Sequence, residues 1–204
     1  MAWSLGERAL PLSFDTPYEI GLDFALLVLV LTLAQLEYTV HEFSASIGAV
    51  QESFAAEQTR AHNRHYLRFY LRQLALLFVL LVASAGLVTG LLVAVGESQW
   101  TALDTSDPVT EGVFAWGVIA YALLVLSLLN GVFLFSLSRP RLVVPALLVA
   151  LVVNAVVGLY LSRTVDYWFA VVGLAAGCLV FALLTTAAAL RVLRRLDYYY
   201  YSAF

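Results

Sequence analysis

Five apolar stretches, each long enough to cross a lipid bilayer, dominate this sequence. A membrane-spanning helix needs about 17 to 25 predominantly apolar residues. The chain is 62% hydrophobic and 12% charged, whereas soluble domains have about 25% charged residues. We therefore expect an all-α polytopic membrane bundle of about five transmembrane helices plus an amphipathic cytoplasmic helix. The expected spans are residues 20–36, 74–95, 112–137, 142–161 and 167–190.

The polar sequence around these spans divides the chain further. Residues 1–19 are expected to form an extracytoplasmic segment, and residues 37–73 a cytoplasmic amphipathic helical linker after the first span. Residues 74–190 then form a four-span membrane bundle, and residues 191–204 a cytoplasmic tail. The N-terminal segment lacks the basic region of a signal peptide, so no cleavage is expected there.

The linker contains the clearest helical pattern outside the spans. Its arginines recur at every fourth residue, which places them along one side of a helix. Aromatic and amide side chains fall on the opposite side at helical spacing. This pattern predicts an amphipathic helix that lies on a membrane surface or enters it. The basic side comprises Arg60, Arg64, Arg68 and Arg72, and the other side Tyr66, Phe69, Tyr70 and Gln73.

The distribution of arginine predicts the orientation of the spans, because cytoplasmic loops carry an excess of basic residues. Arginines occur in the linker, in the turn at 138–141 and in the tail, whereas the acidic loop 96–111 contains none. The linker and the C-terminus are therefore expected in the cytoplasm, and the acidic loop outside. Five spans then leave the N-terminus outside. Arg163 is the exception, with Asp166 close by to neutralise part of its charge.

Polar residues within the spans are candidate functional positions, because such residues are costly in hydrocarbon. Asn130 and Asn154 lie deep in the third and fourth spans, and their amides could line a path for a hydroxyl-rich substrate. The alternative for each is an interhelical hydrogen bond that holds the bundle together. Asp23 lies about one turn inside the first span, where it could instead reach water.

Two Gly-x-x-x-Gly spacings occur in the spans, and this spacing lets helix backbones approach closely. One pair is Gly86 and Gly90, and the other is Gly173 and Gly177. Close packing is the expected role of both pairs, and dimerisation is the more specific alternative.

The three histidines raise the possibility of a metal or haem site. His62 and His65 are three residues apart, as a ligand pair on a helix could be, but these two and His41 lie outside the predicted spans. A transmembrane haem needs axial ligands at membrane depth. The single cysteine, Cys178, excludes an intramolecular disulfide and a cysteine-based metal cluster. We therefore expect no metal site and no cofactor.

The linker arginines have three possible roles: a topology signal alone, binding of anionic lipid headgroups, or docking of a cytoplasmic partner. Near a membrane surface each arginine contributes about 1 kcal/mol to lipid binding. The sequence contains no nucleophile elbow, P-loop or Gly-rich phosphate motif, so we do not expect an enzyme. No basic domain stands apart from the spans, which argues against nucleic-acid binding.

Several short motifs follow one another in a characteristic order. Glu37-Tyr38 and Glu42-Phe43 follow the first span, a long polar helix covers residues 44–72, and Gln73 opens the next span. Later motifs are Asn154 in the span after the basic turn, Arg194-Arg195-Leu196 and the final Phe204. This order resembles the C-terminal half of the Pel exopolysaccharide transporter (PelG-like) family. The sequence departs from the family at residues 51–60, which lack a Gly-Gly type turn, and at the basic turn, which lacks an acidic residue.

The resemblance implies a membrane component of an exopolysaccharide export system in a prokaryotic cytoplasmic membrane, which helps to translocate a sugar polymer. Its expected partners are membrane lipids, other membrane subunits or a missing N-terminal half, and a cytoplasmic glycosyltransferase. The alternative is a non-transporting scaffold or anchor subunit that docks a partner through the helix at 41–73. A third possibility is a sensor subunit that uses the loop at 96–111.

Overall fold

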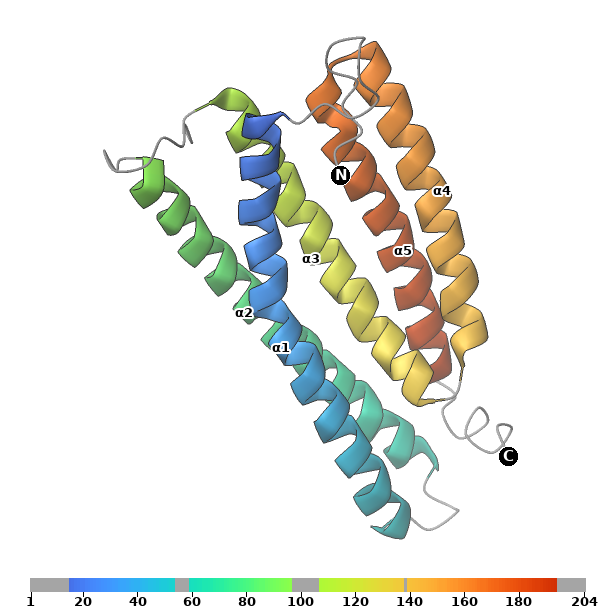
Figure 1. Ribbon diagram of the computed structural model, residues 1–204. Helices are drawn as coiled ribbons and strands as arrows, with labels where there is room; N and C mark the ends of the chain where they lie inside the picture. The colour runs from blue at the N-terminus through green and yellow to red at the C-terminus, as the bar shows by residue number, and fades with distance from the viewer. Residues whose placement is uncertain (1–14, 54–58, 97–106, 138, 194–204) are drawn as a thin grey trace.

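The computed structural model describes residues 15–53, 59–96, 107–137 and 139–193, and the regular structure of these residues is entirely helical (Figure 1). Five of the helices are long and apolar enough to cross a membrane, which confirms the predicted all-α, multi-span membrane protein. A short 3-10 helix, η1 (Tyr167–Phe169), precedes the last of them. The five long helices are α1 (Thr16–Ser53), α2 (Thr59–Gly96), α3 (Pro108–Ser136), α4 (Pro140–Thr164) and α5 (Ala170–Leu193).

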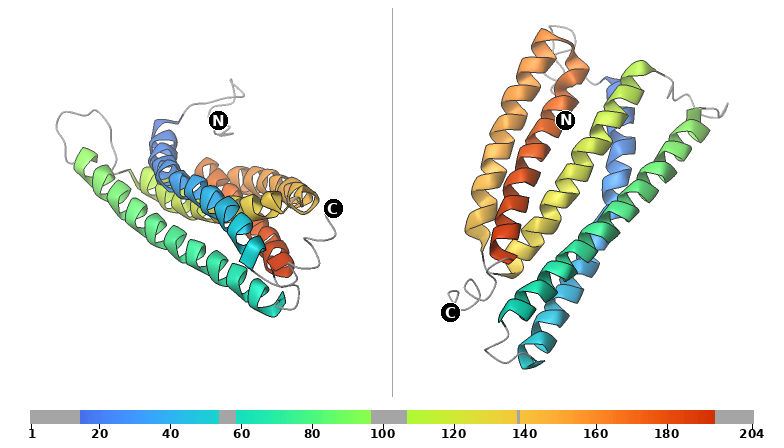
Figure 2. Two further views of the ribbon diagram at one scale, coloured as in Figure 1. Left: turned by 90° about the horizontal axis from the view of Figure 1, so that it is seen from below. Right: turned by 180° about the vertical axis from the view of Figure 1, so that it is seen from behind.

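The helices pack in a chain of neighbours, α1 on α3, α3 on α5 and α5 on α4 (Figures 1 and 2). Helix α2 packs chiefly on α1 and leans away from α3 towards its own C-terminal end. As a result α3 and α5 contain most of the buried side chains, whereas α2 and α4 expose long apolar faces. Such faces are expected where helices meet lipid.

The polar stretch at 41–73 is helical, but it is not a separate helix on the membrane surface. It forms the second half of α1 and the first part of α2, on either side of residues 54–58. No proline occurs between Pro17 and Pro108, so neither helix contains a residue that would force it to end at the membrane boundary. The described residues of this stretch are therefore continuous with the helices of the first two spans and do not form a separate linker helix.

The two helix extensions lie side by side, and their outer parts project beyond the ends of α3, α4 and α5 at the bottom of Figure 1. We call residues 37–53 and 59–73 the hairpin. Each of α1 and α2 has 38 residues and is therefore about 57 Å long, compared with about 30 Å for the hydrocarbon of a bilayer. Residues 44–53 lie beyond the apolar part of α1 and extend it by about 15 Å.

Local sequence explains where the other helices begin. The Asp107 carboxylate accepts a hydrogen bond of 2.7 Å from the backbone N–H of Val109, and Pro108 occupies the first turn of α3. Helix α3 therefore begins at 108 rather than at the predicted 112. Pro140 likewise occupies the first turn of α4, which has no side-chain cap. The Asp166 carboxylate accepts from the N–H of Tyr167 at 2.7 Å and begins η1.

Most of the described arginine side chains lie at one end of the bundle and most of the described acidic side chains at the other, and the acidic exceptions are Glu37 and Glu42 of the hairpin. The end with the hairpin, here called the hairpin end, has the arginines at 64, 68, 72, 139, 141 and 191. The opposite end, here called the Asp107 end, has Arg163 and the acidic residues at 15, 19, 23, 107, 111 and 166. Three separate arginine-bearing segments thus meet at one end, as the sequence pattern predicts.

The two Gly-x-x-x-Gly pairs have different surroundings. A Cβ on Gly177 would lie 2.7 Å from Asn154 Cβ, and a Cβ on Gly173 would clash with the backbone of Gly158, so α4 and α5 touch through this pair. Among the described residues, nothing lies within 4 Å of a Cβ on Gly86 or Gly90. The packing predicted for that pair is therefore not formed between described helices of this chain.

Candidate functional site

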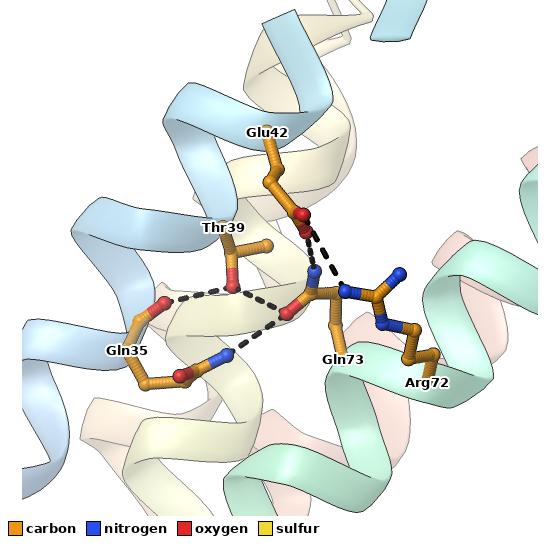
Figure 3. Close-up of polar contacts among 5 residues, drawn as sticks. All are labelled: Gln35, Thr39, Glu42, Arg72 and Gln73. Atoms are coloured by element: carbon orange, nitrogen blue, oxygen red, sulfur yellow. Dashed lines mark hydrogen bonds and ion pairs between the residues drawn. The ribbon is translucent and has the colours of Figure 1, made fainter. Parts of the chain in front are cut away.

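A polar network joins α1 to α2 where the hairpin leaves the bundle (Figure 3). Gln35, Thr39 and Glu42 lie on one face of α1 and point towards Gln73, which is fully buried on α2. The Gln73 carbonyl oxygen accepts from Gln35 Nε2 at 2.8 Å and lies 3.2 Å from the Thr39 hydroxyl. The Gln73 amide nitrogen donates to the Glu42 carboxylate. Both ends of a buried amide are thus paired, which avoids the cost of an unsatisfied polar group.

The network reaches the surface through Glu42. Its carboxylate also accepts from Arg72 Nη2 at 3.5 Å, and the Arg72 side chain is 62% exposed. An ion pair with this exposure contributes about 1 kcal/mol at most, because water screens it. The buried hydrogen bonds of Gln73, rather than this ion pair, therefore hold α1 against α2.

A second network connects three helices around Asn130, which is fully buried on α3. Its Oδ1 accepts from the Tyr70 hydroxyl at 2.8 Å, and Tyr70 belongs to α2. Its Nδ2 donates to Thr186 Oγ1 at 2.8 Å and lies 3.4 Å from Thr185 Oγ1, both on α5. The donors and the acceptor of this amide are all engaged by neighbouring helices.

An aromatic cluster fills the space beside the two networks. Phe43 of α1 packs edge-on against Phe133 of α3, with ring centroids 4.8 Å apart, and Tyr70 packs against the same Phe133 ring at 5.4 Å. Tyr66 and Phe69 of α2 complete the cluster against Phe43. These rings and the Asn130 network attach the base of the hairpin to α3, and the Gln73 network joins its two helices to each other.

The structure does not bring the predicted pathway residues together. Asn130 contacts α5 at Thr185, whereas Asn154 lies against Gly177, about two helical turns away along α5. Asn154 instead lines a separate cavity towards the Asp107 end. Asp23 is exposed on α1. The three residues therefore do not line one continuous seam.

The hairpin arginines follow the predicted division of faces. Arg64, Arg68 and Arg72 are exposed, and the opposite face of α2 is packed, with Tyr66, Tyr70 and Gln73 fully or nearly fully buried. The side chain of Arg60, predicted to belong to the same stripe, lies outside the described residues. The exposed stripe is thus presented by a helix whose other side is attached to the bundle.

Gln35, Thr39, Glu42 and Tyr70 were not predicted as site residues. The spacing of the first three, at intervals of four and three, is a signal that they share a helix face. The sequence does not show that Gln73 would lie opposite them, because that depends on how far α1 and α2 are offset when they pack.

No group of three or more His, Cys, Asp or Glu side chains that could hold a metal occurs among the described residues. His41 and His65 are exposed, Cys178 is buried, and the side chain of His62 lies outside the described residues. The described polar groups at this end therefore join helices, and Arg64 and Arg68 are exposed without an ion pair among the described residues. Comparison of the chain with protein-family models, curated proteins and solved structures finds no match.

Proposed function

We propose that this protein is a membrane anchor or scaffold subunit that docks an acidic partner protein through the hairpin. The observation that supports this proposal is the exposed stripe of Arg64, Arg68 and Arg72 on a helix whose opposite face is buried. Only Arg72 of the three has an ion pair among the described residues. Guanidinium groups form bidentate, charge-assisted hydrogen bonds with carboxylates, so an acidic protein surface complements the stripe.

The attachment of the hairpin favours docking over a topology signal alone. A topology signal needs arginines near a span but needs no fixed placement of them. Here Gln73, Tyr70 and the aromatic cluster hold the helix that bears the stripe. A preorganised surface loses less entropy when it binds, so such an arrangement suits a defined partner.

We further propose that the hairpin end faces the cytoplasm. Three arginine-bearing segments lie at this end, together with Glu37 and Glu42, and six acidic residues lie at the other end, which agrees with the excess of basic residues in cytoplasmic loops. The partner would then be a cytoplasmic protein.

Export of an exopolysaccharide stays a prediction that rests on the resemblance. A path for a sugar polymer needs polar groups that line a common route through the bundle. Asn130 has no free hydrogen-bonding group in this arrangement, and Asn154 lies in another part of the fold. The scaffold function requires no such route, so we favour it.

A photocrosslinking amino acid at the exposed position His65 tests the docking proposal. In native membranes we expect a protein adduct that is strongly reduced in the triple variant Arg64→Gln, Arg68→Gln, Arg72→Gln. High salt should also weaken it, because salt screens exposed charges. The measurement is the mass and yield of adducts after irradiation.

The matched control places the same crosslinker at Val165, which is exposed at the Asp107 end, where no change with the arginine variants is expected. An adduct at position 65 that the three substitutions leave unchanged contradicts docking through the arginines. Adducts with lipid alone would favour binding to anionic headgroups instead.

The orientation is tested with single cysteines in a Cys178→Ala background. His41→Cys, exposed at the hairpin end, should react with a membrane-impermeant maleimide only after the cells are opened. Val165→Cys, at the other end, should react in intact cells. The reverse pattern of labelling would contradict a cytoplasmic hairpin.

A further inference from the structure

A cavity of about 420 Å³ lies between α1, α4 and α5 in the half of the bundle towards the Asp107 end. This volume falls within the usual range of about 300–1,000 Å³ for small-molecule sites. Most of its wall is apolar, and it is partly open. Its polar lining residues are Tyr18, Asn154 and Ser162, and its apolar ones include Leu22, Leu151, Ala155, Leu159 and Leu174.

Part of the cavity wall is exposed on the apolar surface of α4. Leu151 and Leu159, both part of its wall, are 53% and 44% exposed. The lining residues of α4 extend from Leu151 to Ser162, a distance of about 16 Å along the helix. This equals about half the 30 Å thickness of the hydrocarbon, so the lining of the cavity is about as long as one leaflet is thick.

Asn154 is the unusual residue of this wall. It lies about 15 Å from the end of α4 at Thr164, which places it near the middle of the bilayer. No hydrogen bond joins its side-chain amide to any residue in the described ranges, whereas the Asn130 amide is fully paired. Ser162, the hydroxyl nearer the end of α4, donates to the Leu159 carbonyl at 3.3 Å.

The close contact of α4 with α5 keeps Asn154 at this position. Its Cβ lies where Gly177 has no side chain, and its Oδ1 is 3.9 Å from the place that a Cβ on Gly158 would take. The side chain is partly exposed, so the amide is accessible from the cavity. A polar group at membrane depth without a partner is costly, which favours a ligand that supplies one.

Water is a poor ligand for this position. A buried water molecule makes two to four hydrogen bonds to polar groups around it. The nearest other polar lining residue on α4, Ser162, is two turns from Asn154, about 12 Å along the helix. The remaining polar lining residue, Tyr18, belongs to α1, and the rest of the wall is apolar.

We propose that this cavity binds a bilayer-soluble isoprenoid. Its apolar chain fills the cavity, and its polar oxygen accepts a hydrogen bond from the Asn154 amide. The oxygen belongs either to a hydroxyl, as in an isoprenoid alcohol, or to a carbonyl, as in an isoprenoid quinone. The apolar wall and leaflet-long groove match the chain, and the unpaired amide matches the oxygen. The site is separate from the hairpin and does not depend on the docking function.

Binding is measured by native mass spectrometry of the full chain in nanodiscs, with three probes. These are farnesol, which has a hydroxyl, menaquinone-2, which has carbonyls, and farnesene, which has the same chain as farnesol and no oxygen. We expect at least one oxygenated probe to bind about five- to tenfold more tightly than farnesene, the gain of one net hydrogen bond. Which of the two binds identifies the source of the oxygen.

Two variants separate the amide from the cavity. Asn154→Leu should remove the preference for the oxygenated probe and leave farnesene binding, because the apolar space remains. Ala155→Phe, which fills the cavity from its wall, should abolish binding of all three probes. Val156→Phe is the matched control, since Val156 is 62% exposed on the same helix and does not line the cavity.

Equal binding of farnesol, menaquinone-2 and farnesene to the unmodified chain would overturn the proposal. So would an oxygen preference that survives Asn154→Leu, or binding that Ala155→Phe leaves unchanged. If Asn154→Leu does not fold, judged by its helical circular dichroism, the comparison of Ala155→Phe with Val156→Phe decides whether the cavity binds the probes.

Discussion

Alanine at Gly173 is expected to separate α4 from α5 and to destabilise the bundle by about 3 kcal/mol. The added Cβ would overlap the backbone of Gly158 and approach the Asn154 carbonyl oxygen at 3.0 Å. A flexible side chain could move aside, but here the neighbouring atoms are backbone, so the two helices themselves must shift. Reversible unfolding in mixed micelles with increasing SDS measures the loss of stability.

Gly86→Ala provides a matched control for Gly173→Ala, since each adds one methyl group to a Gly-x-x-x-Gly pair within a span. No described residue lies within 4 Å of the new Cβ at position 86, and alanine favours a helix over glycine. We expect Gly86→Ala to be neutral or slightly stabilising. Equal destabilisation by both variants would contradict the close α4–α5 contact.

Leucine at Asn130 is the second substitution with a large expected effect. It removes the hydrogen bonds to Tyr70 and Thr186 and leaves the buried Tyr70 hydroxyl and the partly buried Thr186 hydroxyl without their present partner. Each unsatisfied group costs about 1–3 kcal/mol, although hydrogen bonds between membrane helices average only about 0.6 kcal/mol. We therefore expect a loss of about 1–3 kcal/mol in the free energy of unfolding, measured in the same micelles.

A double-mutant cycle with Tyr70→Phe assigns part of this loss to one hydrogen bond. Tyr70→Phe alone should cost about 0.6–1.7 kcal/mol, because it removes the hydroxyl and keeps the ring that packs on Phe133. In the Asn130→Leu background the same change should cost less, because the shared bond is already lost. Strictly additive losses would show that Asn130 and Tyr70 do not interact.

These two experiments concern opposite halves of the bundle. The α4–α5 contact at Gly173 also determines where Asn154 stands, so a shift of these helices would alter the cavity. The Asn130 network attaches α2 to α3 and α5, so its loss should loosen the hairpin and weaken docking of a partner. Crosslinking at position 65 in the Asn130→Leu variant would show whether docking of a partner depends on the attachment of the hairpin to α3 and α5.

Much of the architecture could be predicted from the sequence. Long apolar segments cannot be hidden in a soluble fold of this size, so the five spans and the all-α class follow from composition and length. The division of α2 into an arginine face and a packed face follows from its helical periodicity. These features depend on local sequence alone, which is why they were predictable.

Other features depend on how the helices meet. The sequence shows two similar glycine pairs and two intramembrane asparagines, but it does not distinguish the members of either set. Packing places Gly173 against α4 and leaves Gly86 open, and it surrounds Asn130 with hydroxyl groups while Asn154 faces a cavity. These contacts depend on the offset and crossing angle of neighbouring helices. The offset and angle result from many weak interactions between side chains that are distant in the sequence, so no local sequence pattern predicts them.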